Sequence, residues 1–110
     1  MTNRDVALRF LERFSAGDID GLGSLLAPDL RFEGPIHRCS SAHEYLSRLR
    51  ADPPTRGGID IISITDNDDS VAVFYHYRKP DAIMIVGQLF GFESGHIARM
   101  LVVFDGRHFA

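Results

Sequence analysis

Three residues that can bind a metal or move a proton lie close together in this 110-residue sequence. His37, Cys39 and His43 follow an H-x-C-x-x-x-H pattern, and all three side-chain types bind zinc. A structural zinc site needs four ligands and no fourth stands near, so we predict no metal site. His37 alone stays a candidate acid or base, because an imidazole titrates near neutral pH. The alternative is that His37 is an ordinary loop residue, exposed to water and without a catalytic role.

Gln88 is a polar side chain within an apolar strand pattern formed by Met84, Val86, Phe90 and Phe92. A buried amide must find partners or lose roughly 1–3 kcal/mol. One interpretation makes Gln88 a donor to the carbonyl of a ligand. The other makes it an amide that is satisfied within the core.

The strand expected at residues 71–78 presents either His76 or its tyrosine neighbours to the interior, because side chains alternate between the two faces. The tyrosine side belongs to the more continuous apolar set, so we expect Tyr75 and Tyr77 to face inward. Tyr75 can then donate its hydroxyl to a ligand oxygen. Tyr77 is expected to pack within the core or a dimer contact.

Motifs of other enzyme classes are missing from the sequence. There is no G-x-S-x-G segment for a serine nucleophile. There is also no dinucleotide-binding or P-loop fingerprint. We therefore expect no cofactor.

The first half of the chain is expected to form the helices that position these residues. Apolar residues at three- and four-residue spacing predict a helix over about residues 3–16, capped by Thr2 and stopped by Gly17. Asp18 begins a short second helix, which holds leucines as far as position 26 and ends at Pro28. An S-x-x-E capping box at residues 41–44 begins a third helix.

One strand is expected before the third helix, and four are expected after it. The first is expected at residues 30–33, and period-two patterns separated by turn residues predict four more. These are expected at residues 59–64, 71–78, 83–93 and 97–104. The order of elements indicates an α+β domain with a meandering antiparallel sheet.

The composition is that of one ordinary domain spanning residues 1–110, with 45% hydrophobic residues and a single cysteine. A net charge of -3 gives no electrostatic basis for nucleic-acid binding. No apolar stretch approaches the roughly 20 residues of a membrane span. Charged residues at positions 4, 5 and 9 are unlike a signal peptide, so we expect a cytoplasmic protein that contacts no membrane.

Three segments in this order resemble the SnoaL-like, or NTF2-like, superfamily of cone-shaped α+β barrels. Its opening phrase is similar to residues 14–35, FSAGDIDGLGSLLAPDLRFEGP. Its third helix resembles residues 39–49, CSSAHEYLSRL. Its closing hairpin resembles residues 90–105, FGFESGHIARMLVVFD. Together the segments cover nearly the whole chain.

The resemblance implies three N-terminal helices packed into a highly curved, mostly antiparallel sheet around a deep apolar pocket. The superfamily includes ketosteroid isomerases, polyketide cyclases and epoxide hydrolases beside binding proteins, and most members dimerise through the outer sheet face. We therefore expect a small hydrophobic ligand and a homodimer. The expected pocket residues are Phe10, Phe14, Phe32, Tyr75, Gln88, Phe90, Met100 and Phe104.

The isomerase members need a carboxylate base and two acidic donors for the resulting oxyanion. By resemblance these positions are Gly34, Phe10 and Gln88 here, so all three are altered and steroid isomerisation itself is not expected. Glu33 would replace the base if a β-bulge turned it inward. A regular strand instead places Glu33 on the face opposite to Gly34.

Two functions stay open. The first is a cofactor-free isomerase or cyclase acting on a small hydrophobic carbonyl compound, with His37, Gln88, Tyr75 and Glu33 as candidate catalytic residues. The second is a non-catalytic ligand-binding or dimerisation module. The loss of the three acid–base positions motivates the second function, and the sequence leaves open whether the protein is an enzyme.

Overall fold

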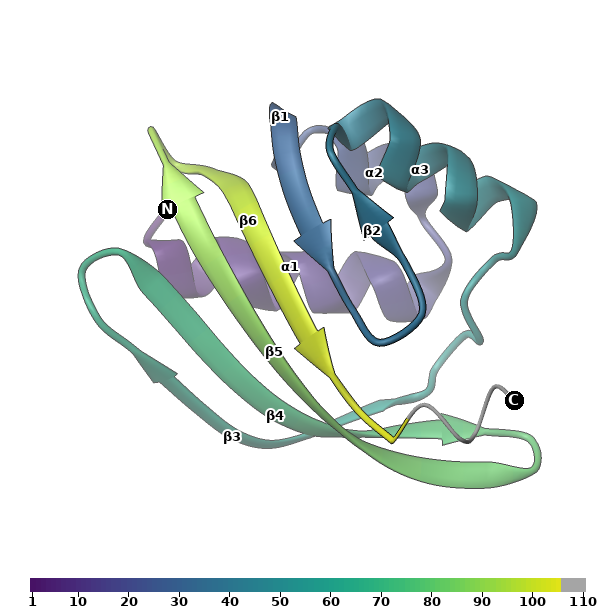
Figure 1. Cartoon of the computed structure of the whole chain (residues 1–110). Helices are drawn as coiled ribbons and strands as arrows, with labels where there is room; N and C mark the ends of the chain where they lie inside the picture. Colours follow the sequence, from purple (N-terminus) through teal and green to yellow (C-terminus); the bar gives the residue numbers. More distant parts are fainter. Residues whose placement is uncertain (106–110) are drawn as a thin grey trace.

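The computed structural model describes residues 1–105, in which three helices pack against the inner face of a curved, six-stranded sheet (Figure 1). The helices are α1 (Asn3–Ala16), α2 (Ile19–Gly23) and α3 (Ala42–Ala51). The strands are β1 (Leu26–Glu33), β2 (Arg38–Cys39), β3 (Ile59–Asp66), β4 (Ser70–Lys79), β5 (Ala82–Glu93) and β6 (His96–Val103).

The strands lie in the order β2-β1-β6-β5-β4-β3. Only the β1–β6 pair is parallel, and the other neighbours are antiparallel. Within residues 1–105 the edge strands β2 and β3 do not pair with each other, so the sheet stays open. The expected α+β fold, with helices packed into a mostly antiparallel curved sheet, is confirmed. The short strand β2 was not expected from the sequence.

Helix α1 begins and ends where the sequence predicts. The Thr2 hydroxyl accepts a hydrogen bond from the backbone N–H of Asp5, and the Asp5 carboxylate accepts one from the N–H of Thr2. Gly17 ends the helix in the left-handed conformation, at a φ of 74°, which glycine adopts without strain. The apolar stripe of α1 is buried against the sheet, at Val6, Ala7, Phe10 and Leu11.

The boundary between α2 and β1 differs from the prediction. The helix ends at Gly23, and the segment expected to continue it to Pro28 is already a strand from Leu26. The carbonyl of Leu25 accepts a hydrogen bond from the N–H of Ile97, which draws the chain into the sheet beside β6. Pro28 is tolerated because it lies in an irregular part of the β1–β6 pairing, where no ladder donor is needed.

Helix α3 forms one half of its predicted capping box. The hydroxyl of Ser41 accepts from the N–H of Glu44, whereas the Glu44 carboxylate accepts from the N–H of Ser40 rather than from that of Ser41. The helix ends before Pro53 and Pro54, which cannot donate a helical hydrogen bond. Tyr45, in the first turn of α3, is buried.

Strand β4 presents its tyrosines to the helices. Tyr75 is 5% exposed, whereas its neighbour Phe74 is 51% exposed on the outer face. Tyr77 shares the inner face, and its ring meets the ring of Phe14 edge to face at 6.3 Å between centroids. Of the two alternations that the sequence allows, the structure therefore has the one that we expected.

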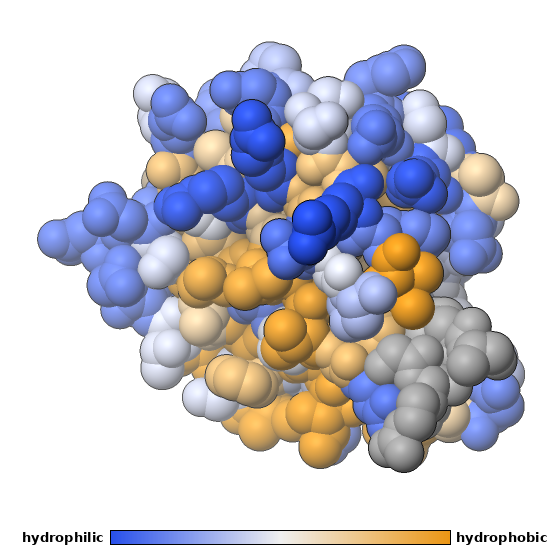
Figure 2. Space-filling view, in the orientation of Figure 1, coloured by the Kyte–Doolittle hydropathy of each residue, from blue (hydrophilic) through white to orange (hydrophobic). Residues whose placement is uncertain are grey.

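The outer face of the sheet carries an unusual number of exposed apolar side chains (Figure 2). Hydrophilic side chains surround them in this view. We call this set the outer apolar patch: Phe74, Ile83, Ile85, Leu89, Leu101 and Val103. Among residues 1–105, no helix has the length and apolar character needed to cross a bilayer.

Candidate functional site

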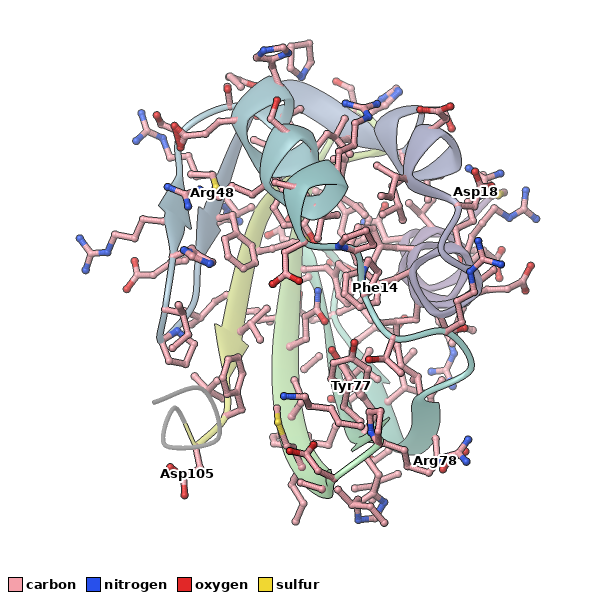
Figure 3. The ribbon with its side chains drawn as sticks, turned by 90° about the vertical axis from the view of Figure 1, so that its right-hand side faces the viewer. Phe14, Asp18, Arg48, Tyr77, Arg78 and Asp105 are labelled. Carbon is pink, nitrogen blue, oxygen red and sulfur yellow. The ribbon has the colours of Figure 1, made fainter. Side chains whose placement is uncertain are left out.

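A cavity of about 400 Å³ lies between the inner face of the sheet, α3 and the loop that follows α3. Aromatic and aliphatic side chains form most of its wall, including Phe14, Phe32, Val86 and Phe104. Figure 3 shows Phe14 and Tyr77 below α3 on this side of the molecule. A wider hollow of about 710 Å³ has a mixed lining of charged, polar and apolar residues. The buried Gln88 lies in the wall of the smaller cavity.

Gln88 is held in one orientation at the inner end of the cavity. Its Oε1 accepts a hydrogen bond of 2.7 Å from the Tyr75 hydroxyl, and its Nε2 lies 3.4 Å from the Sδ of Met100. A thioether sulfur is a weak acceptor. The amide nitrogen therefore keeps most of its capacity to donate to a stronger acceptor, such as a ligand oxygen.

Tyr45 brings a second donor to the same cavity. Its ring packs against Phe10 and Phe32, with centroid distances of 6.5 Å and 4.9 Å, and the residue is only 6% exposed. Among residues 1–105, no acceptor lies within hydrogen-bond distance of its hydroxyl. Because Tyr45 lines the cavity, that hydroxyl is directed to a place where a ligand oxygen can lie.

Both buried tyrosines are held in the protonated form. Burial raises the pKa of Tyr45 far above its usual range, and the nearby Tyr75 and Cys39 add to the effect. Burial is also the main reason why the pKa of Tyr75 is raised, with Tyr77 as a second cause. At neutral pH the two hydroxyls are therefore donors and cannot act as bases.

The mouth of the cavity carries the charged groups. Arg48 Nη1 donates to His37 Nδ1 at 3.2 Å, and both side chains are exposed. Asp52, which follows α3, and Lys79, at the end of β4, line the same opening. The site thus has a neutral hydrogen-bonding end inside and a charged rim at the surface.

A family model described as a SnoaL-like domain matches residues 7–100 of this sequence. The chain belongs to the SnoaL-like family. This agrees with the resemblance in the sequence and with the arrangement of helices over a curved sheet.

Solved structures of NTF2-like proteins share the fold of this SnoaL-like domain. An NTF2-like protein of unknown function from Cytophaga hutchinsonii is 18% identical, with a TM-score of 0.88 over 99% of this chain and 95% of that chain. A candidate ketosteroid isomerase from Kribbella flavida is 19% identical, with a TM-score of 0.82 over 94% and 77%. A candidate polyketide cyclase from Pseudomonas putida is 18% identical, with a TM-score of 0.83 over 99% and 96%. None of the curated proteins compared is significantly similar in sequence.

Several candidate residues of the SnoaL-like domain lie away from the inner end of the cavity. Glu33 is exposed, and its carboxylate lies 3.6 Å from the guanidinium of Arg38. It follows the regular alternation and does not turn inward. His76 points to the outer side, opposite to Tyr75, and His43 is exposed in the first turn of α3. Within residues 1–105, no three metal-ligating side chains come together.

The expected pocket residues divide into two groups. The cavity is lined by five of them: Phe14, Phe32, Tyr75, Gln88 and Phe104. Phe10, Phe90 and Met100 are instead buried in the core, because α1 packs directly on β5 at this point. They support the wall from behind, and the sulfur of Met100 contacts Gln88.

Four of the polar residues described above were not found from the sequence: Tyr45, Arg48, Asp52 and Lys79. Tyr45 is part of the apolar pattern of the third helix, which marks its ring as buried but gives no information about its hydroxyl. Arg48 lies three residues later, on the same side of α3. Their three-residue spacing was the sequence signal that could have placed both side chains at the same site.

Proposed function

We propose that this SnoaL-like protein binds a small apolar carbonyl compound in the cavity between α3 and the sheet. The carbonyl oxygen accepts hydrogen bonds from the Tyr45 hydroxyl and the Gln88 amide, and the apolar part of the ligand contacts the aromatic wall. The observation that carries the proposal is the Tyr45 hydroxyl, which belongs to a residue only 6% exposed in the cavity wall and for which residues 1–105 supply no acceptor.

The energetics of buried polar groups favour this assignment. A hydrogen bond from the Tyr45 hydroxyl to a ligand oxygen, formed in exchange for one to water, contributes a net stabilisation of about 0.5–1.5 kcal/mol. The cavity volume of about 400 Å³ lies within the ordinary range of small-molecule sites. Because the inner donors are neutral, they suit a neutral oxygen such as that of a ketone.

Binding is supported over catalysis by the protonation states at the inner end. Deprotonation of a carbon acid needs a base near the reacting carbon. The ionisable groups that line this part of the cavity include Tyr45, Tyr75 and the Cys39 thiol, and burial raises the pKa of all three, which favours their protonated forms. Gln88 does not titrate.

A cofactor-free isomerase or cyclase is the second candidate function, and the position of His37 favours it. His37 lines the mouth, and its Nδ1, which accepts from Arg48 in this structure, becomes able to take a proton if that contact opens. Turnover of a panel of cyclic and linear ketones that is lost in a His37→Ala variant would support this candidate. Turnover that is absent, or that His37→Ala leaves unchanged, would remove it.

We also propose that the protein is a homodimer that contacts its second copy through the outer apolar patch. Monomeric proteins rarely expose a large continuous apolar surface. The proposal includes a cytoplasmic location, where a free thiol such as that of Cys39 stays reduced.

Matched ligands test the binding function. The probes are 1-indanone and indane, which differ by the ketone oxygen and are titrated into isotopically labelled protein while amide shifts are followed by NMR. We expect 1-indanone to bind about tenfold more tightly, the equivalent of one good hydrogen bond. Tyr45→Phe removes one oxygen atom and should cancel most of that advantage, with indane binding unchanged. Equal binding of the two probes to the wild-type protein would contradict the proposal.

A further inference from the structure

The polar groups of the cavity form two separate sets, and only the inner set is used by the function proposed above. The outer set at the mouth contains Arg48 from α3, His37 from the loop before β2, Asp52 after α3 and Lys79 at the end of β4. Two of these four side chains are cations and one is an anion. Lys79 has a further interaction within the molecule. Arg48 is therefore the cation to consider for a ligand.

Arg48 makes an unusual contact for an arginine. Its Nη1 donates to the Nδ1 of His37 at 3.2 Å, and among residues 1–105 no carboxylate lies within 4.0 Å of its guanidinium. Because arginine can only donate, His37 accepts at Nδ1 and carries its proton on Nε2. Most of the five guanidinium N–H groups and the imidazole N–H are left for another acceptor.

Arg50, two residues after Arg48 on α3, is an arginine whose charge is paired within the fold. Arg50 Nη2 lies 3.0 Å from the Asp20 carboxylate, so its charge is balanced within the fold. Arg48 has no such partner at the cavity mouth. The two side chains share a helix and are both exposed, and they differ in what they contact.

Tyr45 and Arg48 are three residues apart on α3, so they lie on neighbouring turns of one helix face, with Cβ atoms about 5–6 Å apart. Both line the cavity. Because both side chains line one cavity of about 400 Å³, a ligand that fills it can contact both of them.

We propose that the ligand is an apolar keto acid, whose ketone oxygen accepts from Tyr45 and Gln88 and whose carboxylate binds Arg48 and the His37 N–H at the mouth. This assignment rests on the proposed function and adds the anionic group. A planar carboxylate matches the fork of the guanidinium and makes charge-assisted hydrogen bonds with it. The single anion at the mouth, Asp52, does not ion-pair with Arg48 among residues 1–105.

The test compares acids with their neutral esters on one skeleton. The probes are 3-benzoylpropionate and 4-benzoylbutyrate, each beside its methyl ester, titrated at low salt by calorimetry. We expect at least one acid to bind about tenfold more tightly than its ester. In Arg48→Gln that preference should fall to within about twofold, because the acid loses its charged partner whereas the ester still meets a neutral donor. The matched control Arg50→Gln should keep the wild-type preference.

The outcomes separate this inference from the function on which it rests. If acids and esters bind equally to the wild-type protein, or if Arg48→Gln keeps the preference, the keto-acid assignment is wrong while carbonyl binding stands. If Tyr45→Phe weakens acid and ester to the same extent, the two contacts are independent, as proposed. If neither acid nor ester binds, both proposals fail.

Discussion

At the scale of single residues, the pair formed by Tyr75 and Gln88 holds the inner end of the cavity in place. Gln88→Leu should lower the free energy of unfolding by about 1–3 kcal/mol, because the buried Tyr75 hydroxyl then loses its acceptor. The double variant Tyr75→Phe/Gln88→Leu should recover part of that loss. Urea unfolding of the two single variants and the double variant measures the coupling. Strictly additive effects would show that the hydrogen bond contributes nothing.

The raised pKa values of Tyr45 and Tyr75 predict a loss of stability in alkali. The folded protein favours the protonated hydroxyls, so their contribution is complete below the unfolded pKa of about 10 and declines as the pH rises above it. The slope is about 1.4 kcal/mol per pH unit for each tyrosine that titrates only on unfolding. Urea unfolding between pH 8 and 11 should show a smaller decline in Tyr45→Phe than in the wild type. The same decline in both proteins would contradict the burial of this hydroxyl.

At the scale of elements, α3 carries both Tyr45 and Arg48, so its N-terminal cap should affect the site. Ser41→Ala removes the hydroxyl that accepts from the Glu44 N–H and should cost about 1 kcal/mol of stability. Ser40→Ala is the neighbouring control, since within residues 1–105 Ser40 makes a hydrogen bond through its backbone N–H and none through its hydroxyl. Thermal unfolding should show a lower Tm for Ser41→Ala alone. Equal effects of the two changes would argue against the cap.

Elements whose signals are local were predictable from the sequence, and those that depend on distant partners were not. Thr2, Gly17 and Ser41 act on backbone groups within a few residues, so caps and periodicity located α1 and α3. The start of β1 is fixed by Ile97, about seventy residues away, and that contact overrides a helical pattern of leucines. The Tyr45 hydroxyl was missed for a related reason, because a missing acceptor is a property of the packed molecule.

At the scale of the whole molecule, the outer apolar patch predicts a dimer. Ile85 is 63% exposed on β5, within that patch, and Ile85→Glu would place a charge there. Sedimentation at micromolar concentration should show a wild-type dimer and an Ile85→Glu monomer with an unchanged circular dichroism spectrum. Ile36→Glu, at an exposed isoleucine outside the patch, should leave the dimer intact. A wild-type monomer would contradict the proposed interface.

The most direct test of the central claim is the infrared carbonyl stretch of ¹³C-labelled 1-indanone bound to the protein. A hydrogen bond from Tyr45 weakens the C=O bond, so we predict a lower frequency in the complex than in an apolar solvent. In Tyr45→Phe the frequency should return most of the way toward the solvent value. A bound ketone with the apolar-solvent frequency, or one that Tyr45→Phe leaves unchanged, would contradict the account.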